Sequence, residues 1–243
     1  MVTMPPKAKS STLDMIEVPQ QLAFELPHRQ ALGVEDFLVS QSNDAAVALV
    51  DRWPAWPLGA AVISGPAGSG KSHLGNVWRL KSNASVINAC DVATASVPEL
   101  AAHGALVIED VARATDEQAL FHLLNLVREQ RLQILLTSDA APGDLIVTLP
   151  DLRSRLKALP HAAIAPPDDQ LLRVVLVKLF ADRQLAVDPQ IIAYLLLRME
   201  RSMDAARSVV AEVDRQALMM KRSVTRAVAA AALESLGFSG KSR

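Results

Sequence analysis

The stretch that most restricts the fold of this chain is GPAGSGKS at residues 65–72. It has the spacing G-x-x-x-x-G-K-[ST], and it lies between an apolar run, AAVIS, and a stretch with helical spacing. Glycines in such a loop let backbone amides turn toward an anion, and the helix that follows adds the positive end of its dipole. A flexible glycine-serine turn is the alternative, but the flanking strand and helix favour a phosphate-binding loop.

The residue types in this loop divide the binding of a nucleotide between the backbone and the side chains. Lys71 is placed to reach the β and γ phosphate oxygens, and Ser72 is a hydroxyl ligand for Mg²⁺. We therefore expect ADP or ATP, with Mg²⁺, as the cofactor. The residues expected around it in this loop are Gly65, Pro66, Gly68, Ser69, Gly70, Lys71, Ser72 and His73.

Two acids end another apolar run, ALVIED at residues 105–110. Because parallel strands end at one edge of a sheet, Glu109 and Asp110 are expected beside the phosphate loop, where carboxylates bind the metal and orient the attacking water. We assign both acids to catalysis, and Glu109 with Ser72 to the metal. A pair of solvated acids at a strand end is the alternative at this stage.

Apolar runs and amphipathic stretches alternate as far as residue 165, which predicts an α/β fold with a five-stranded parallel sheet flanked by helices. Strands are predicted at 60–65, 84–89, 105–110, 133–138 and 161–165, and helices at 44–53, 72–81 and 116–131. Beyond Pro166 the spacing is helical throughout, which predicts a small all-helical domain with helices over 168–183, 188–200, 202–220 and 224–236. The expected divisions are a disordered tail (1–18), an apolar peptide (19–27), an α/β domain (28–165), a helical domain (166–237) and a flexible tail (238–243).

Composition limits the classes of partner. The 243 residues are 50% hydrophobic, and 25 basic against 26 acidic residues leave a net charge of −1, so the chain has no general attraction to DNA or anionic membranes. No signal peptide or bilayer-spanning apolar run is present, and we expect a cytoplasmic protein without membrane contact. The single cysteine, Cys90, excludes an internal disulfide and is expected to be buried and inert in the run SVINAC.

The peptide PQQLAFELP at residues 19–27 carries Leu22, Phe24 and Leu26 at alternate positions. Three apolar side chains so close to a chain end are costly to leave in water. They fit either a strand of this domain or an extended peptide that binds a groove on another protein, with Gln21 hydrogen-bonding at one end.

Three further motifs accompany the phosphate loop, whose GKSHL form is itself characteristic. They are FLVSQSNDAA at 37–46, LTSDAAP at 136–142 and LPDLRSRL at 149–156. In this combination and order, over roughly residues 20–235, the chain resembles the AAA+ ATPases of the DnaA/Hda family, most of all the short Hda-type regulators.

The resemblance implies a role for each motif. The residues implied at the nucleotide are Val39 and Asn43 near the adenine, and Thr137, Ser138 and Asp139 near the γ-phosphate as sensor 1. Arg155 would be the arginine finger that enters a neighbour's nucleotide site, because a guanidinium stabilises charge on a transferring phosphoryl group. Arg153 is the alternative finger, and the motif position favours Arg155.

Two departures from the family pattern predict weak ATP hydrolysis by the chain itself. Glu109 stands where the family usually has aspartate, and the extra methylene moves the carboxylate by about 1.5 Å. Asp204 stands at the sensor 2 position, where an arginine normally touches the phosphates, so we expect the chain to hold ADP. Arg207 is expected to form an ion pair with Asp204, and a replacement of the lost cation by Arg201 or Arg207 is the alternative.

The resemblance also implies a function, that of a negative regulator of replication initiation. Such a regulator binds the DNA polymerase III sliding clamp through Gln21, Leu22, Phe24 and Leu26, engages ATP-bound DnaA and promotes hydrolysis of its ATP. No duplex-reading module follows VTRAVAAAALESL, which favours the short regulator and implies no sequence-specific DNA binding. A helicase-loader ATPase, a clamp-tethered scaffold with a vestigial nucleotide site and a truncated initiator stay open, as does pairing of two copies through the peptide.

Overall fold

The computed structural model describes residues 38–220 and 223–238. The expected tail 1–18 and the peptide with Gln21, Leu22, Phe24 and Leu26 lie outside these residues. The strands are β1 Ala60–Ser64, β2 Ser85–Asn88, β3 Ala105–Glu109, β4 Gln133–Ser138 and β5 His161–Ala163. The α-helices are α1 Asp44–Asp51, α2 Lys71–Ser82, α3 Val97–Ala102, α4 Glu117–Gln130, α5 Pro150–Ala158, α6 Asp169–Asp182, α7 Pro189–Leu196, α8 Met203–Met220 and α9 Arg226–Ser235.

The five strands form one parallel sheet in the order β2-β3-β4-β1-β5. The predicted α/β fold and the positions of all five strands are therefore confirmed. Since β1 lies inside the sheet between β4 and β5, the loop that follows it emerges beside the carboxyl end of β4, where Ser64 is paired with Ser138. This arrangement brings the phosphate loop next to the predicted sensor 1 segment.

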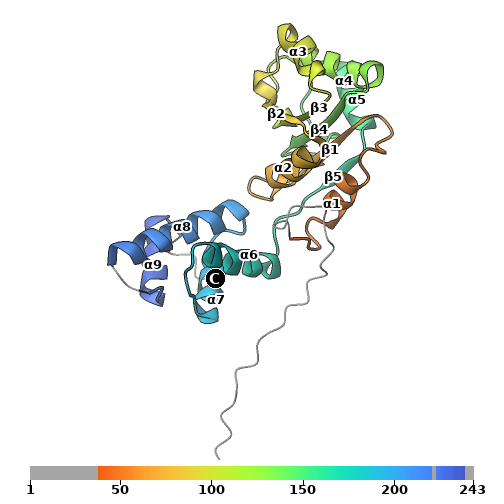
Figure 1. Ribbon diagram of the computed structural model, residues 1–243. Helices are drawn as coiled ribbons and strands as arrows, with labels where there is room; N and C mark the ends of the chain where they lie inside the picture. The colour runs from red at the N-terminus through yellow and green to blue at the C-terminus, as the bar shows by residue number, and fades with distance from the viewer. Residues whose placement is uncertain (1–37, 221–222, 239–243) are drawn as a thin grey trace, which may run out of the picture.

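Helices cover both faces of the sheet, so the α/β domain has three layers (Figure 1). On one face α1 and α2 pack through Val50, Leu74 and Trp78 against alternate residues of β1, β3 and β4. On the other face α3, α4 and α5 pack through residues such as Leu123 and Leu152 against the intervening strand positions. The two clusters explain why the inner strands are continuous apolar runs.

The edge strands differ from the expectation of burial on both faces. β2, at the edge of the sheet, alternates between partly buried and exposed residues, and Val86 is half exposed. The predicted burial of Cys90 is also wrong. Cys90 is exposed in a 3₁₀ turn, Ala89–Asp91, that follows the edge strand, and its thiol lies 3.6 Å from the Asp91 carboxylate.

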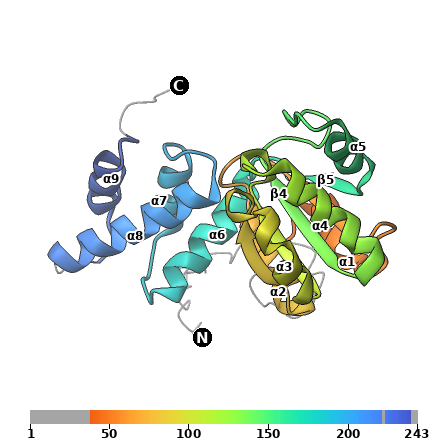
Figure 2. The ribbon, with the colours of Figure 1, turned by 90° about the horizontal axis from the view of Figure 1, so that it is seen from above.

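The remaining helices, α6 to α9, form the helical lid with its own apolar core (Figures 1 and 2). The Asp168 and Asp188 carboxylates accept hydrogen bonds from the first turns of α6 and α7, and Pro189 occupies the start of α7. These caps account for the close agreement between the predicted and observed helix starts. None of the helices among the described residues is long and apolar enough to cross a membrane.

Candidate functional site

The phosphate loop between β1 and α2 is held closed by Lys71. The Lys71 ammonium is buried and donates hydrogen bonds to the carbonyls of Gly65, at 2.6 Å, and Pro66, at 2.9 Å. An ammonium has three protons, so these two bonds leave one for an anion over the loop. In the part of the chain that is described, no backbone carbonyl accepts the N–H groups of Lys71 and Ser72, which begin α2. The loop therefore retains the backbone donors and the charge that phosphate binding needs.

Two glycines of the loop differ in what lies over them. Gly70 has φ +105° and would meet nothing within 4 Å if it carried a Cβ, so the loop is open at this position. Gly68 has φ +69°, and a Cβ there would lie 2.7 Å from the Ser202 Cβ. The lid therefore covers the loop at Gly68 and leaves it open at Gly70.

The predicted acids and the sensor 1 segment meet at the carboxyl ends of β3 and β4. Asp110 has φ +57°, and its N–H donates a 3.2 Å hydrogen bond to the buried hydroxyl of Thr137. The Ser138 carbonyl accepts from Gly65 N–H, which joins β4 to the phosphate loop, and Asp139 is exposed. The structure thus brings Asp110, Thr137 and the loop together through hydrogen bonds, with Glu109 partly buried at the end of β3.

The residues expected at Mg²⁺ fit that ion only as part of a nucleotide complex. Ser72 is exposed in the first turn of α2. Within the described residues there is no group of three or more metal-ligating side chains. A hydroxyl and one carboxylate match a site in which Mg²⁺ takes its other ligands from phosphates and water.

Asn43, which the resemblance implies near the adenine, makes hydrogen bonds within its own segment. Its carboxamide is buried and shapes the segment before α1, because its oxygen accepts from Ser40 N–H and its nitrogen donates to the Leu38 carbonyl, each at 2.9 Å. The segment is also joined to the end of β5, since Ala165 N–H donates to the Ser42 carbonyl. Asn43 therefore positions the segment, while Val39, in the same segment, packs against the α1–α2 side of the sheet.

The helical lid touches the phosphate loop through the start of α8. Met203 N–H donates a 2.8 Å hydrogen bond to the Gly68 carbonyl, and the buried Ser202 hydroxyl caps α8 by accepting from Ala205 N–H. A Cβ on Gly68 would lie 3.3 Å from an Asp204 carboxylate oxygen. The acid at the sensor 2 position thus lies beside the phosphate loop.

The ion pair predicted for Asp204 is confirmed. Arg207 Nη1 lies 3.0 Å from Asp204 Oδ1, and both side chains are more than half exposed. Arg201 pairs instead with Asp169 at the start of α6, also at 3.0 Å. Burial, followed by the positive charge of Arg207, lowers the pKa of His73 on α2.

The two candidate finger arginines of α5 have different surroundings. The Arg153 guanidinium donates to the Val147 carbonyl through Nε, at 3.1 Å, and through Nη2. Arg155 is partly exposed, and among the described residues no hydrogen bond or ion pair of its side chain is found. The local structure therefore uses Arg153 and leaves Arg155 available to an outside partner.

Glu117 has a part in this region that the sequence pattern does not predict. Its carboxylate accepts hydrogen bonds from Thr148 N–H, Thr148 Oγ1 and Leu149 N–H, and so fixes the turn that begins α5. The signal available was weak: an acid in the first turn of the helix at 116–131, which is common at any helix start.

Comparison with known proteins agrees with this architecture. The chain is 27% identical to the chromosomal replication initiator protein DnaA of Latilactobacillus sakei over 142 residues, which are 56% of this chain and 32% of that protein. The fold matches domain III of the Thermotoga maritima DnaA with a TM-score of 0.67 at 19% identity, covering 82% of this chain and 94% of the other. It matches the AMPPCP-bound DnaA from Aquifex aeolicus with a TM-score of 0.62 at 22% identity, covering 75% and 65%. No protein-family model matches.

The parallel sheet, the loop after β1 and the helical domain beside it form the AAA+ fold found in these solved structures. Among the proteins compared, the chain is similar to DnaA in part of its sequence and in its fold. It spans about a third of the length of the curated DnaA that it matches.

Proposed function

We propose that this chain is a nucleotide-holding AAA+ regulator of replication initiation that promotes hydrolysis of the ATP bound to DnaA, by supplying Arg155 to the nucleotide site of DnaA. The observation that carries the proposal is the contrast on α5, where Arg153 is bound to its own loop and Arg155 has no partner among the described residues. Similarity to DnaA supports the choice of partner, because AAA+ protomers of related fold can pack against one another through equivalent faces.

In the proposed reaction a water molecule attacks the γ-phosphorus of the ATP held by DnaA. The bond from that phosphorus to the β–γ bridging oxygen breaks, which yields ADP and inorganic phosphate. Negative charge grows on the bridging and γ-phosphoryl oxygens in the transition state, and the Arg155 guanidinium stabilises it from the neighbouring subunit. This chain needs no turnover of its own for the reaction.

The surroundings of the chain's own phosphate loop support a resting role for its nucleotide. The loop has the donors for phosphates, but the lid residue that corresponds to sensor 2 is Asp204, whose carboxylate lies beside Gly68. Arg207 forms an ion pair with that acid. A carboxylate there opposes a γ-phosphate more than it opposes ADP. We therefore propose that the chain holds ADP as a structural cofactor, and that Ser72 and Glu109 would hold a Mg²⁺ ion that neutralises phosphate charge.

We propose that the peptide at residues 21–26, which lies outside the described residues, recruits the protein to the sliding clamp on DNA. Its alternate apolar side chains after Gln21 support binding in an extended form to the groove of the sliding clamp. The regulator would then act only where the clamp encircles DNA.

A single assay tests the proposal. ATP-bound DnaA is incubated with DNA-loaded clamp and this protein, and the release of phosphate is followed. We expect this protein to stimulate hydrolysis, and Arg155→Ala to lower the stimulation at least about 1,000-fold. Arg153→Lys should largely retain it. Gln21→Ala and Leu22→Ala should abolish only the part of the stimulation that depends on the clamp. Equal stimulation by Arg155→Ala would rule out the finger and favour a clamp-tethered scaffold.

A further inference from the structure

A large apolar side chain stands almost wholly in water on the loop before α5. Ile146 is 97% exposed, the highest value among the large apolar residues that the structure describes, while its neighbours Leu145 and Val147 are each 7% exposed. The loop buries two side chains and turns the one between them outward. An isoleucine in this position contributes nothing to the core of its own domain.

The loop that presents Ile146 is held on its C-terminal side, next to α5. Arg153 binds the carbonyl of Val147, directly after Ile146, and Glu117 binds Thr148 and Leu149. Desolvation of the Glu117 carboxyl opposes its ionisation, but the hydrogen bonds from Thr148 and Leu149 outweigh it and lower the pKa of Glu117. At neutral pH this acid is charged, and the loop keeps its shape. A preorganised side chain loses little conformational entropy when a partner covers it.

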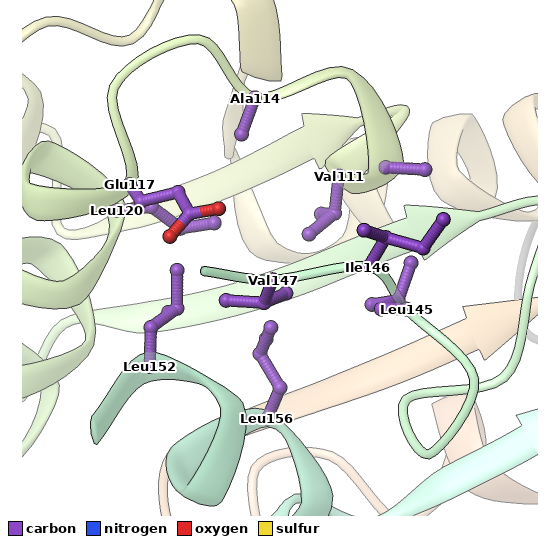
Figure 3. A pocket seen from close by; sticks show the side chains of 10 residues that line it. Val111, Ala114, Glu117, Leu120, Leu145, Ile146, Val147, Leu152 and Leu156 are labelled. Carbon is purple, nitrogen blue, oxygen red and sulfur yellow. The ribbon is translucent and has the colours of Figure 1, made fainter. Parts of the chain in front are cut away.

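A small recess with mostly aliphatic lining residues lies beside the exposed isoleucine. Figure 3 shows it between the start of α4, the loop and α5, with Ile146 at its rim. Its lining includes Val111, Leu120, Val147, Leu152 and Leu156. A projecting side chain beside a recess is the local shape of an interface that interlocks with a partner.

The same loop and helix carry Arg155. Leu149 precedes the first residue of α5, and Arg153, which binds the loop, is two residues before Arg155 on that helix. Ile146 and Arg155 therefore belong to one rigid unit. The helix has Arg153, Arg155 and Lys157 against a single acid, Asp151, so the unit complements an anionic surface.

We infer that Ile146 is an apolar anchor that docks beside the nucleotide site of the AAA+ protomer into which Arg155 projects. This inference rests on the proposed function, because the partner is the ATP-bound protomer of that proposal. The bound triphosphate supplies the anionic surface that α5 complements, and the anchor sets the affinity of the complex, while the finger acts on the transition state. Ile146 is thus a positioning residue for hydrolysis in the partner.

Titration of ATP-bound DnaA separates the two roles. We expect Ile146→Ser to raise the half-saturating concentration of this protein about 10-fold or more, since a buried isoleucine is lost from the interface, and to leave the maximal hydrolysis rate unchanged. Arg155→Ala should lower the maximal hydrolysis rate and leave the half-saturating concentration unchanged. Ile146→Leu should restore the half-saturating concentration. The control is Leu197→Ser, because Leu197 is also a largely exposed aliphatic residue, at 76%, but lies in the lid.

Direct binding of ATP-bound DnaA, measured by biolayer interferometry, tests the anchor independently of the role proposed for Arg155. Wild-type affinity in Ile146→Ser would overturn the anchor and leave the proposed finger intact if Arg155→Ala still abolishes stimulation. Weaker binding in Ile146→Ser and Leu197→Ser alike would also overturn it, as a general effect of surface hydrophobicity. Loss of self-association in Ile146→Ser, with DnaA binding unchanged, would show instead that the anchor serves a second copy of this chain.

Discussion

The backbone N–H of Met203, the first residue of α8, donates a 2.8 Å hydrogen bond to the carbonyl of Gly68 in the phosphate loop. This bond joins the helical lid to the α/β domain directly at the candidate site. A backbone bond depends on the path of the chain and not on a side-chain type, so no sequence pattern reports it. It makes the lid position and the loop conformation depend on each other.

The first prediction concerns the space above Gly68. Gly68→Ala should lower the free energy of unfolding by about 1–3 kcal/mol, because alanine is strained at φ +69° and its Cβ would lie 2.7 Å from Ser202 Cβ. Denaturant unfolding measures the change. The matched control is Gly143→Ala, since Gly143 has open space and no positive φ, and this variant should be within about 0.5 kcal/mol of wild type or slightly more stable. Equal effects at both positions would contradict a lid seated on the loop.

The second prediction uses His73 as a reporter of the lid. Burial and then the charge of Arg207 lower the pKa of His73, so Arg207→Ala should raise it toward 6.5. A proton NMR titration, with the His73 signal assigned through His73→Gln, follows the change. Arg215→Ala, which removes an exposed arginine further along α8, should leave it in place.

The lowered pKa of His73 also makes the free energy of unfolding depend on pH. The folded-state pKa of His73 is below the unfolded value of 6.5, so at lower pH the unfolded chain binds the proton more readily. The His73 contribution is therefore neutral well above pH 6.5 and destabilising as the pH falls through that value. His73→Gln should reduce this acid-side loss. A His73 pKa that does not respond to Arg207→Ala would show that the lid does not lie against α2 in solution.

The third prediction tests the acid beside the loop. Asp204→Asn should raise the affinity for ATP relative to ADP by several-fold, because a carboxylate near the γ-phosphate position is removed. The effect stays modest, since the Asp204 side chain is 68% exposed and water screens it. Isothermal titration with both nucleotides gives the ratio. Asp169→Asn removes a lid acid in a similar ion pair with Arg201 and should leave the ratio of the ATP and ADP affinities unchanged. If both variants have the same ratio, the proposed cause of the ADP preference is wrong.

The fourth prediction concerns acid stability of the lid. Hydrogen bonds from Arg215, Gln216 and Ser235, in that order, lower the pKa of Glu212 to about 2. A carboxyl with a depressed pKa stabilises the fold above its unfolded pKa of 4.5 and loses this contribution as the pH falls toward 2. The stability difference between wild type and Glu212→Gln, measured by unfolding at several pH values, should therefore be largest above pH 5 and shrink toward pH 2. A difference independent of pH would contradict the assignment.

The features that could be predicted from the sequence are those encoded locally. Apolar runs predict the strands, and helical spacing predicts both a helix from residue 188 and the Asp204–Arg207 pair. The short helix α3 was missed because it spans six residues, too few for a periodic signal. Cys90 was misplaced because an apolar run does not reveal whether its strand lies at an edge.

The parts of the site that could not be predicted depend on contacts between distant segments. The carboxamide of Asn43 bonds to Leu38 and Ser40, and only the folded path of the segment shows this. Glu117 reaches Thr148 across 31 residues of sequence. The motif also does not predict that Arg153 is hydrogen-bonded and Arg155 is not, because the acceptor of Arg153 is a backbone carbonyl, which every residue has.

The last prediction separates those two arginines by stability alone, without any partner. Arg153→Ala removes a charged donor from the Val147 carbonyl and should lower the free energy of unfolding by about 1–2 kcal/mol. Arg155→Ala removes a side chain without a hydrogen bond or ion pair among the described residues and should change it by less than about 0.5 kcal/mol. Denaturant unfolding of both variants supplies the comparison. Because a residue kept for a partner gives its own fold little, a large loss in Arg155→Ala would assign it a structural role and weaken the proposed finger.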